Sequence, residues 1–150
     1  MISMNETMKN ELQGVIQVEC SEQVEEILKS VVSRVKMIRD CIIYDERGTL
    51  NEENVNFERV LKLAGDWTGY EVNCNEIRFS KKCIPKGQII SALLRLGEML
   101  SSIAMDRKIV VYISLYEKDL EVRFHRFRED EKGWLVDNMD KYTMPIIRLN

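Results

Sequence analysis

A single histidine carries most of what the sequence offers for acid–base chemistry. His125 is the only histidine of the chain, and it lies in the segment Arg123-Phe124-His125-Arg126-Phe127-Arg128. A histidine assisted by a nearby arginine could move a proton on a bound substrate. Basic residues that alternate with aromatic rings could instead bind a single nucleic-acid strand. Alternation along a strand points Phe124 inward and Arg123 and His125 outward, so we favour a third interpretation, a solvated sheet face.

Motifs that would define an enzyme are absent from the sequence. It has no G-x-S-x-G nucleophile turn, no G-x-x-x-x-G-K-S/T phosphate loop, no G-x-G-x-x-G fingerprint and no H-E-x-x-H pair. The four cysteines, Cys20, Cys41, Cys74 and Cys83, form no C-x-x-C pair, which predicts reduced structural thiols. A metal-ligand pair of Cys74 and Cys83 is the alternative. We therefore predict a protein that is not an enzyme and that uses no cofactor and no metal.

Charge divides the middle of the chain into an acidic and a basic part. Residues 45–76 contain eight acidic and three basic side chains, whereas residues 78–108 contain seven basic and two acidic ones. Each part could be an ordinary solvated surface. The acidic part could also form a patch for a basic partner. The basic part, with residues 123–128, would be the corresponding surface of a nucleic-acid-binding module, but the net charge of −3 disfavours that function.

Two large aromatic residues lie beside acids in the segment Asp66-Trp67-Thr68-Gly69-Tyr70-Glu71, which we predict to begin with an exposed turn. Tryptophan and tyrosine are favoured anchors of protein interfaces. The alternative is that both rings close the core behind the preceding helix. We predict a partner-binding surface formed by the acidic and aromatic residues of this region, namely Asp45, Glu46, Glu52, Glu53, Asp66, Trp67, Tyr70 and Glu71.

The length and composition predict one globular domain. The chain has 150 residues, of which 45% are hydrophobic and 31% charged, and only two are proline. A chain of this length can bury about two-thirds of its unfolded surface. No apolar run approaches the ~18 residues that span a bilayer. The polar N-terminus lacks a signal sequence, so we expect a cytoplasmic protein with a flexible terminus at residues 1–10 and a single domain at 11–150.

Three helices are predicted from apolar residues spaced three and four apart. The first covers residues 22–39, with Ser21 as its N-cap. The second covers residues 52–64, with Asn51 as its N-cap and Gly65 ending it. The third covers residues 86–105 and begins after Pro85. These helices must pack their apolar stripes on a common layer.

Alternating residues predict the strands of that layer. Residues 109–116 and 120–127 alternate clearly and form an antiparallel hairpin. Residues 70–80 are predicted as a strand whose change of phase indicates a bulge near Asn75. Residues 146–149 are predicted as an edge strand, and residues 11–20 could be either strand or helix. This order predicts the α+β class, with helices packed on one face of an antiparallel sheet.

The chain resembles the small acidic α+β immunity proteins of bacterial polymorphic and contact-dependent toxin systems. The resemblance lies in the helix-rich N-terminal half, the segment from Trp67 to Phe79, the hairpin that ends in Arg123-Phe124-His125-Arg126-Phe127-Arg128, and the tail Gly133–Tyr142. It implies a cytoplasmic protein that binds and neutralises a cognate toxin domain, for example a basic nuclease domain. It implies no membrane partner, and it assigns no role to an individual residue.

Overall fold

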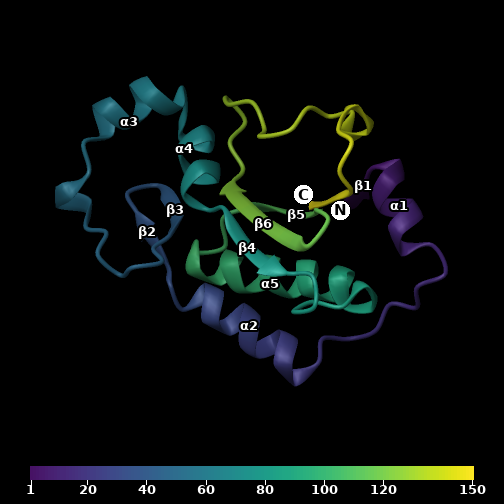
Figure 1. Ribbon diagram of the computed structural model, residues 1–150. Coiled ribbons are helices and arrows are strands. Elements are labelled where there is room, and N and C mark those ends of the chain that lie inside the picture. Colours follow the sequence, from purple (N-terminus) through teal and green to yellow (C-terminus); the bar gives the residue numbers. More distant parts are fainter.

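A five-stranded antiparallel sheet lies at the centre of the computed structural model, which describes residues 1–150 (Figure 1). Its strands follow the order β1-β7-β5-β6-β4, so the first and last strands of the chain lie side by side. The strands are β1 (Ile2–Met4), β7 (Ile146–Leu149), β5 (Ile109–Leu115), β6 (Asp119–Arg126) and β4 (Ile77–Ser80). All of their pairings are antiparallel, as the alternating sequence of β5 and β6 predicts.

Helices α5 (Ile89–Ile103) and α2 (Glu22–Val32) cover one face of this sheet (Figure 1). Together with the sheet they enclose the largest apolar cluster, in which Leu93, Leu96, Val111 and Phe124 are fully buried. Helix α1 (Glu6–Leu12) lies beside β7 and the short 3-10 helix η2 (Lys86–Gln88). This arrangement confirms the predicted α+β class. No helix is both long enough and apolar enough to cross a bilayer.

A small hairpin separates this core from a second apolar cluster. It consists of β2 (Val35–Ile38) and β3 (Cys41–Tyr44), joined by a tight turn in which Arg39 adopts a positive φ of 52°. One face of the hairpin contributes Val35 and Ile42 to the large cluster. The other face contributes Ile38, Cys41 and Ile43 to the smaller cluster. Because neighbouring strand residues point to opposite faces, the apolar hairpin serves both clusters.

The smaller cluster is closed by α3 (Phe57–Ala64), by α4 (Trp67–Cys74), and by Leu50 and Val55, which flank the short 3-10 helix η1 (Glu52–Asn54). Figure 1 shows α3 at the periphery of the molecule, with α4 between it and the sheet. The opposite face of the five-stranded sheet is covered by residues 127–145, which include η3 (Met139–Lys141). There Leu135 and Met139 pack against Val110, Tyr112 and Ile146 in a third apolar cluster. Both faces of β5 are therefore buried.

Several predicted elements are confirmed. The hairpin of residues 109–116 and 120–127 is β5 and β6, with Val111 opposite Phe124. The helix predicted over residues 86–105 is η2 followed by α5. The predicted end at Gly65 is also confirmed, since this residue follows α3 with a φ of 88°. Glycine adopts that conformation without the steric penalty of a side chain.

The helix predicted over residues 22–39 is wrong in its second half. Helix α2 ends at Val32, and Val35–Ile38 forms β2. Val35 and Ile38 lie three residues apart, so they continue the helical stripe in the sequence, although both also fit a strand. The helix predicted over residues 52–64 is divided: Asn51 caps η1, and the side chain of Asn56 caps α3 by accepting from the Arg59 amide at 3.1 Å.

The strand predicted over residues 70–80 is wrong in its first half, because residues up to Cys74 belong to α4. Asp66 starts this helix by accepting a hydrogen bond from the Gly69 amide at 2.6 Å. The change of phase near Asn75 is therefore not a bulge. It marks the place where a helix ends and β4 begins.

The two ends of the chain also differ from the predictions. Residues 1–10, expected to be flexible, contain β1 and most of α1, and Ser3 lies opposite Arg148 in the sheet. The buried Asn5 side chain accepts from the amides of Met8 (3.0 Å) and Ile146 (2.9 Å). Strand β7 is internal, between β1 and β5, and not an edge strand. Residues 13–21 form neither strand nor helix.

Candidate functional site

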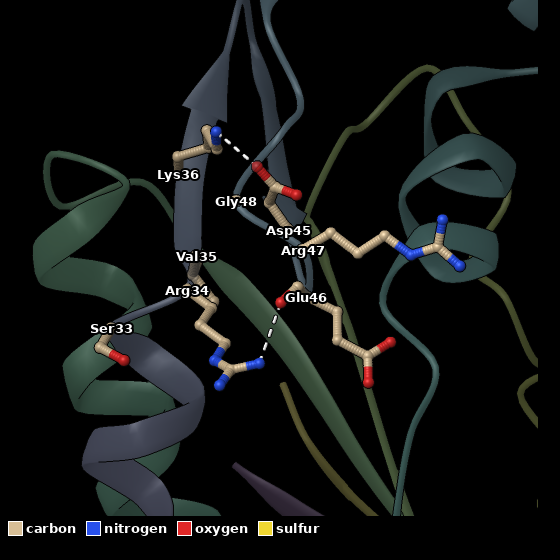
Figure 2. A pocket seen from close by; sticks show the side chains of 8 residues that line it. All are labelled: Ser33, Arg34, Val35, Lys36, Asp45, Glu46, Arg47 and Gly48. Carbon is tan, nitrogen blue, oxygen red and sulfur yellow. Dashed lines mark hydrogen bonds and ion pairs between the residues drawn. The ribbon is translucent and has the colours of Figure 1, made fainter.

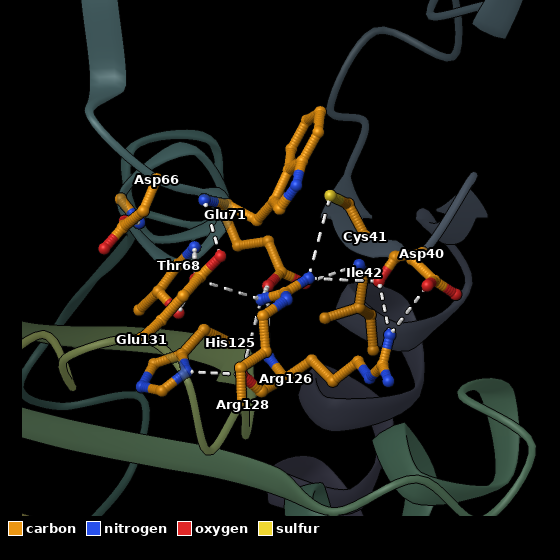
Figure 3. A network of polar contacts seen from close by, with 12 residues as sticks. Asp40, Cys41, Ile42, Asp66, Thr68, Glu71, His125, Arg126, Arg128 and Glu131 are labelled. Carbon is orange, nitrogen blue, oxygen red and sulfur yellow. Dashed lines mark hydrogen bonds and ion pairs between the residues drawn. The ribbon is translucent and has the colours of Figure 1, made fainter. Parts of the chain in front are cut away.

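A buried carboxylate on α4 connects the small hairpin to the central sheet (Figure 3). Glu71 is fully buried, and its Oε2 accepts from the Ile42 amide of β3 at 2.7 Å. Its Oε1 accepts from the Arg126 amide at the end of β6 (3.3 Å) and from the Arg128 guanidinium. Burial raises the pKa of Glu71 to about 7, although Arg128 and the two amides oppose this shift. The carboxylate thus acts as a connector inside the protein.

Asn75 completes this connection one helical turn later. Its Nδ2 donates to the carbonyl oxygens of Ile42 (2.8 Å) and Phe124 (2.9 Å). Its Oδ1 accepts from the Tyr44 amide at 2.7 Å. Buried backbone groups need partners, and no strand pairs with this edge of β3. Glu71 and Asn75 therefore replace a strand between β3 and β6.

The start of α4 is held by a second carboxylate. Glu131 accepts from the amides of Trp67 (3.2 Å) and Thr68 (2.8 Å) and from the Thr68 hydroxyl (2.7 Å). The first amides of a helix have no partner within the helix, and they attract negative charge. These contacts lower the pKa of Glu131 although burial opposes them. The backbone of Trp67 is consequently fixed from two sides, by Glu131 and by the cap at Asp66.

Trp67 lines an open hollow of about 360 Å³. The hollow is lined by Arg39, Asp40, Cys41 and Trp67, and we call these four residues the Trp67 surface. Trp67 packs edge-to-face on Phe57, with ring centroids 5.8 Å apart. The Arg39 guanidinium lies over the same Phe57 ring at 3.9 Å. Burial raises the pKa of the Cys41 thiol to about 12, so the thiol is neutral.

His125 lies on the other side of the network, in a smaller cavity of about 130 Å³. Its Nδ1 is 2.8 Å from the Arg126 carbonyl oxygen, which can only accept, so Nδ1 carries the proton. Its Nε2 therefore accepts from the Tyr112 hydroxyl at 3.2 Å. Burial lowers the pKa of His125, and the positive charge of Arg128 acts in the same direction. The ring is neutral and has no free nitrogen.

The family of the chain can be identified from its sequence. A sequence model of the family described as "Uncharacterized protein PM0498 family" matches residues 3–150. The chain belongs to this family. The matched residues include all of the strands from β4 to β7, the small hairpin and α4, so the Trp67 surface and the His125 cavity both lie within the family domain. No curated protein and no solved structure matches the chain.

Three of the predicted partner-binding residues are internal. Glu71 is fully buried, Tyr70 lies in the smaller apolar cluster, and Asp45 is 7% exposed. Figure 2 shows Asp45 paired with Lys36 at the open end of the hairpin, where the nitrogen–oxygen distance is 2.6 Å. Asp45 also accepts from the Leu50 amide at 2.9 Å. We expected an exposed turn with surface acids, but these side chains hold the chain together.

The other predicted partner-binding residues do not form one patch. Glu52 lies near the hairpin turn, 3.7 Å from the Arg39 guanidinium. Glu46 is exposed at the opposite end of the hairpin, where its carbonyl oxygen accepts from Arg34 (Figure 2). Glu53 is exposed, and Asp66 is partly buried as a helix cap. Of the predicted set, only Trp67 belongs to the Trp67 surface.

The outward face of β6 was predicted to be solvated, and this is wrong for His125, which is 3% exposed. The prediction that Phe124 points into the main core is confirmed. Residues 127–145 cover the second face of the sheet, which strand alternation cannot reveal. Arg123 does not line the His125 cavity. It binds Glu76 and Glu121 and lies over the Trp134 ring, so the two residues share no pocket.

The arginines of residues 123–128 are paired within the protein. Arg126 lies 3.3 Å from an oxygen of Asp40, and Arg128 binds Glu71. Pairing of this kind removes the free positive charge that phosphate groups would contact. Local sequence does not show that Arg128, Glu131 and Asn75 belong to a network, because most of their partners lie 31 or more residues away along the chain.

Proposed function

We propose that the protein binds another protein through the Trp67 surface and acts as an immunity protein, which neutralises a cognate toxin domain in the bacterial cytoplasm. The observation that carries this proposal is the position of Trp67, which lines an open hollow together with Arg39. Tryptophan and arginine are the residues most enriched among those that dominate binding energy at protein interfaces. The hollow also offers a recess for a side chain of the partner.

The rigidity of this surface supports the same proposal. The Trp67 amide donates to Glu131, and the Trp67 ring packs against Phe57 and Tyr70, whose centroids lie 5.8 and 6.4 Å away. Arg39 is held over Phe57 and beside Glu52. A surface that is ordered before binding loses little conformational entropy when a partner docks.

Acidic side chains should contribute less to partner binding than the acidic composition of residues 45–76 suggests. Asp45 and Glu71 are paired internally, so they cannot steer a basic partner over the distance between two molecules. Glu52 remains at the surface next to Arg39 and is available to a basic residue of a toxin domain, such as a nuclease. Binding should therefore depend mainly on Trp67 and Arg39 and only modestly on salt concentration.

Affinity purification from the native bacterium tests the proposal. Tagged wild-type protein, Trp67→Ala and Ile16→Ala are compared, because Ile16 is an apolar residue that is 83% exposed and far along the chain from the Trp67 surface. We expect wild-type protein and Ile16→Ala to recover one toxin domain in equal molar amount. Trp67→Ala should lose it, because truncating a central anchor costs about 2 kcal/mol or more of binding free energy.

Co-expression of the recovered domain with each variant provides the functional test. Cells should survive with wild-type protein and with Ile16→Ala, and should stop growing with Trp67→Ala. Circular dichroism of purified Trp67→Ala shows whether the variant is folded. Equal protection by wild-type protein and folded Trp67→Ala would reject the Trp67 surface, and a recovered partner without toxicity would reject the immunity function.

A further inference from the structure

The His125 cavity is separate from the Trp67 surface and is a candidate ligand site in its own right. It is lined by Tyr112 and His125 of the central sheet, by Arg148 of β7, and by Lys132 and Asp137 of the covering segment. Its volume is about 130 Å³. Since about 10–15 Å³ is enough for one water molecule, the space suits a molecule of several non-hydrogen atoms.

Most polar groups of the wall already have partners. Both nitrogens of His125 are hydrogen-bonded, to Tyr112 and to the Arg126 carbonyl. Glu131 accepts three hydrogen bonds from Trp67 and Thr68. Arg128 is bound by Glu71. These groups shape the cavity, but they have little capacity left for a ligand.

Two cations of the same wall have no carboxylate partner. Arg148 donates from Nε to the Ser3 hydroxyl at 3.3 Å and also hydrogen-bonds to the Tyr112 hydroxyl, but it takes part in no ion pair of the structure. Lys132 likewise has no carboxylate within 4.0 Å. Among the acidic side chains that line the cavity, only Asp137 also takes part in no ion pair. The side-chain charges not neutralised by the wall are thus two positive and one negative.

We propose that this cavity binds a small oxyanion, a phosphate group or a short carboxylate, between Arg148 and Lys132. A guanidinium presents several donors in one plane, which matches the oxygen atoms of such anions. Arg148 is partly buried, so its attraction for an anion is screened less than that of a cation at an open surface. Asp137 opposes an anion at the same site and reduces its affinity.

His125 provides a specific probe, because it is the only histidine of the chain. Its ring resonances are followed by NMR while inorganic phosphate or acetate is added to the full-length protein at constant pH and ionic strength. Sodium chloride serves as the control salt. We expect a saturable shift of these resonances with at least one of the two anions and none with chloride. Preference for phosphate assigns a phosphate group, and preference for acetate assigns a carboxylate.

Charge-neutral variants then locate the anion. Arg148→Gln and Lys132→Gln should each weaken binding about tenfold, because a charged hydrogen bond is lost. Asp137→Asn should strengthen binding. Arg47→Gln is the matched control, since Arg47 lines the open hollow of Figure 2 and is also unpaired. Lys132 is exposed in a loop, so its variant remains informative if Arg148→Gln fails to fold.

Two results would overturn the proposal. The first is the absence of a saturable His125 shift with both anions. The second is binding that is unchanged in Lys132→Gln and Asp137→Asn, because an anion in this cavity must respond to both charges in opposite directions. Neither result bears on the Trp67 surface, which is tested by a partner protein and by a different set of variants.

Discussion

Glu71 on α4 and Asn75 at the C-cap of the same helix stand four residues apart and together hydrogen-bond to the edges of β3 and β6. Residues at this spacing lie on the same side of a helix. The five-stranded sheet and the small hairpin are separate sheets, and these two side chains supply hydrogen bonds that a strand would otherwise supply. The position of the hairpin, and with it the Trp67 surface, therefore depends on two polar side chains.

Replacing Asn75 with alanine should destabilise the protein by about 2 kcal/mol or more, because buried carbonyl groups of Ile42 and Phe124 lose their donor. Urea unfolding measures the free energy, and hydrogen exchange should show faster exchange of the Tyr44 amide. Asn73→Ala is the matched control, since Asn73 is an exposed asparagine on the same helix. Equal stability of the two variants would refute the role of Asn75.

Replacing Glu71 with glutamine should cost about 3 kcal/mol, because the Arg128 charge is 8% exposed and would lose its closest carboxylate. Glu131 lies 4.0 Å away and should limit the loss. The double variant Glu71→Gln with Arg128→Met should regain part of this stability, since it removes the uncompensated charge. Urea unfolding of the wild type, both single variants and the double variant gives the coupling energy. Additive losses would contradict the ion pair.

The pH dependence of stability should contain a contribution from His125. Burial lowers its pKa below the ordinary 6.5, so the unfolded chain takes up a proton before the folded protein does. This contribution is fully present above about pH 6.5, and it is lost as the pH falls from there towards the folded pKa. The raised pKa of Glu71 has the opposite effect between its ordinary value of 4.5 and about 7, where stability falls as the pH rises.

Comparison with His125→Gln separates the two contributions, because Glu71 is present in both proteins. Glutamine can still donate to the Arg126 carbonyl and accept from Tyr112. The wild type should lose stability relative to the variant as the pH falls below about 6.5, and the difference should be constant at higher pH. Unfolding by urea at a series of pH values measures this difference. A constant difference at every pH would show that His125 titrates normally in the fold.

Replacing Gly69 with alanine should loosen the junction of α3 and α4. A Cβ atom at this position would lie 2.6 Å from the carbonyl oxygen of Ala64, which is backbone and cannot rotate away. We expect a net loss of about 1–3 kcal/mol, although alanine favours a helix by about 1 kcal/mol. Gly133→Ala is the control, because its nearest atom lies 3.6 Å away. Stabilisation by Gly69→Ala in thermal unfolding would contradict the close approach.

The periodicity of hydrophobic residues predicts an element correctly where the environment of that element stays the same along its whole length. Strands β5 and β6 and helix α5 were predicted because their inner residues recur at a constant interval, as in Ile109, Val111 and Ile113. Helix α4 was mistaken for a strand because Thr68, Tyr70, Glu71 and Val72 are buried on several sides, so no apolar stripe remains. Strand β2 was missed because Val35 and Ile38 also continue the spacing of α2.

The candidate sites were less predictable than the fold. The residue type of Trp67 makes it a candidate for binding, whereas nothing local in the sequence shows that Asp45 and Glu71 are internal, because their partners, Lys36 and Arg128, are fixed only by the tertiary fold. Helical placement of residues 67–75 would have put Glu71 and Asn75 on one side and revealed a polar pair facing inward. The His125 cavity could not be foreseen, because residues 127–145 have no repeating pattern that predicts what they cover.

The division of the apolar residues into unequal clusters has a consequence for local opening of the chain. The main cluster contains 22 buried residues, whereas the cluster that holds α3 contains five. The free energy of local opening increases with the apolar area that the opening exposes. Residues 46–66 should therefore form the cooperative unit that detaches first, while the central sheet stays folded. A protease should cut the native protein in this unit, and a partner seated on Trp67 should slow that cleavage.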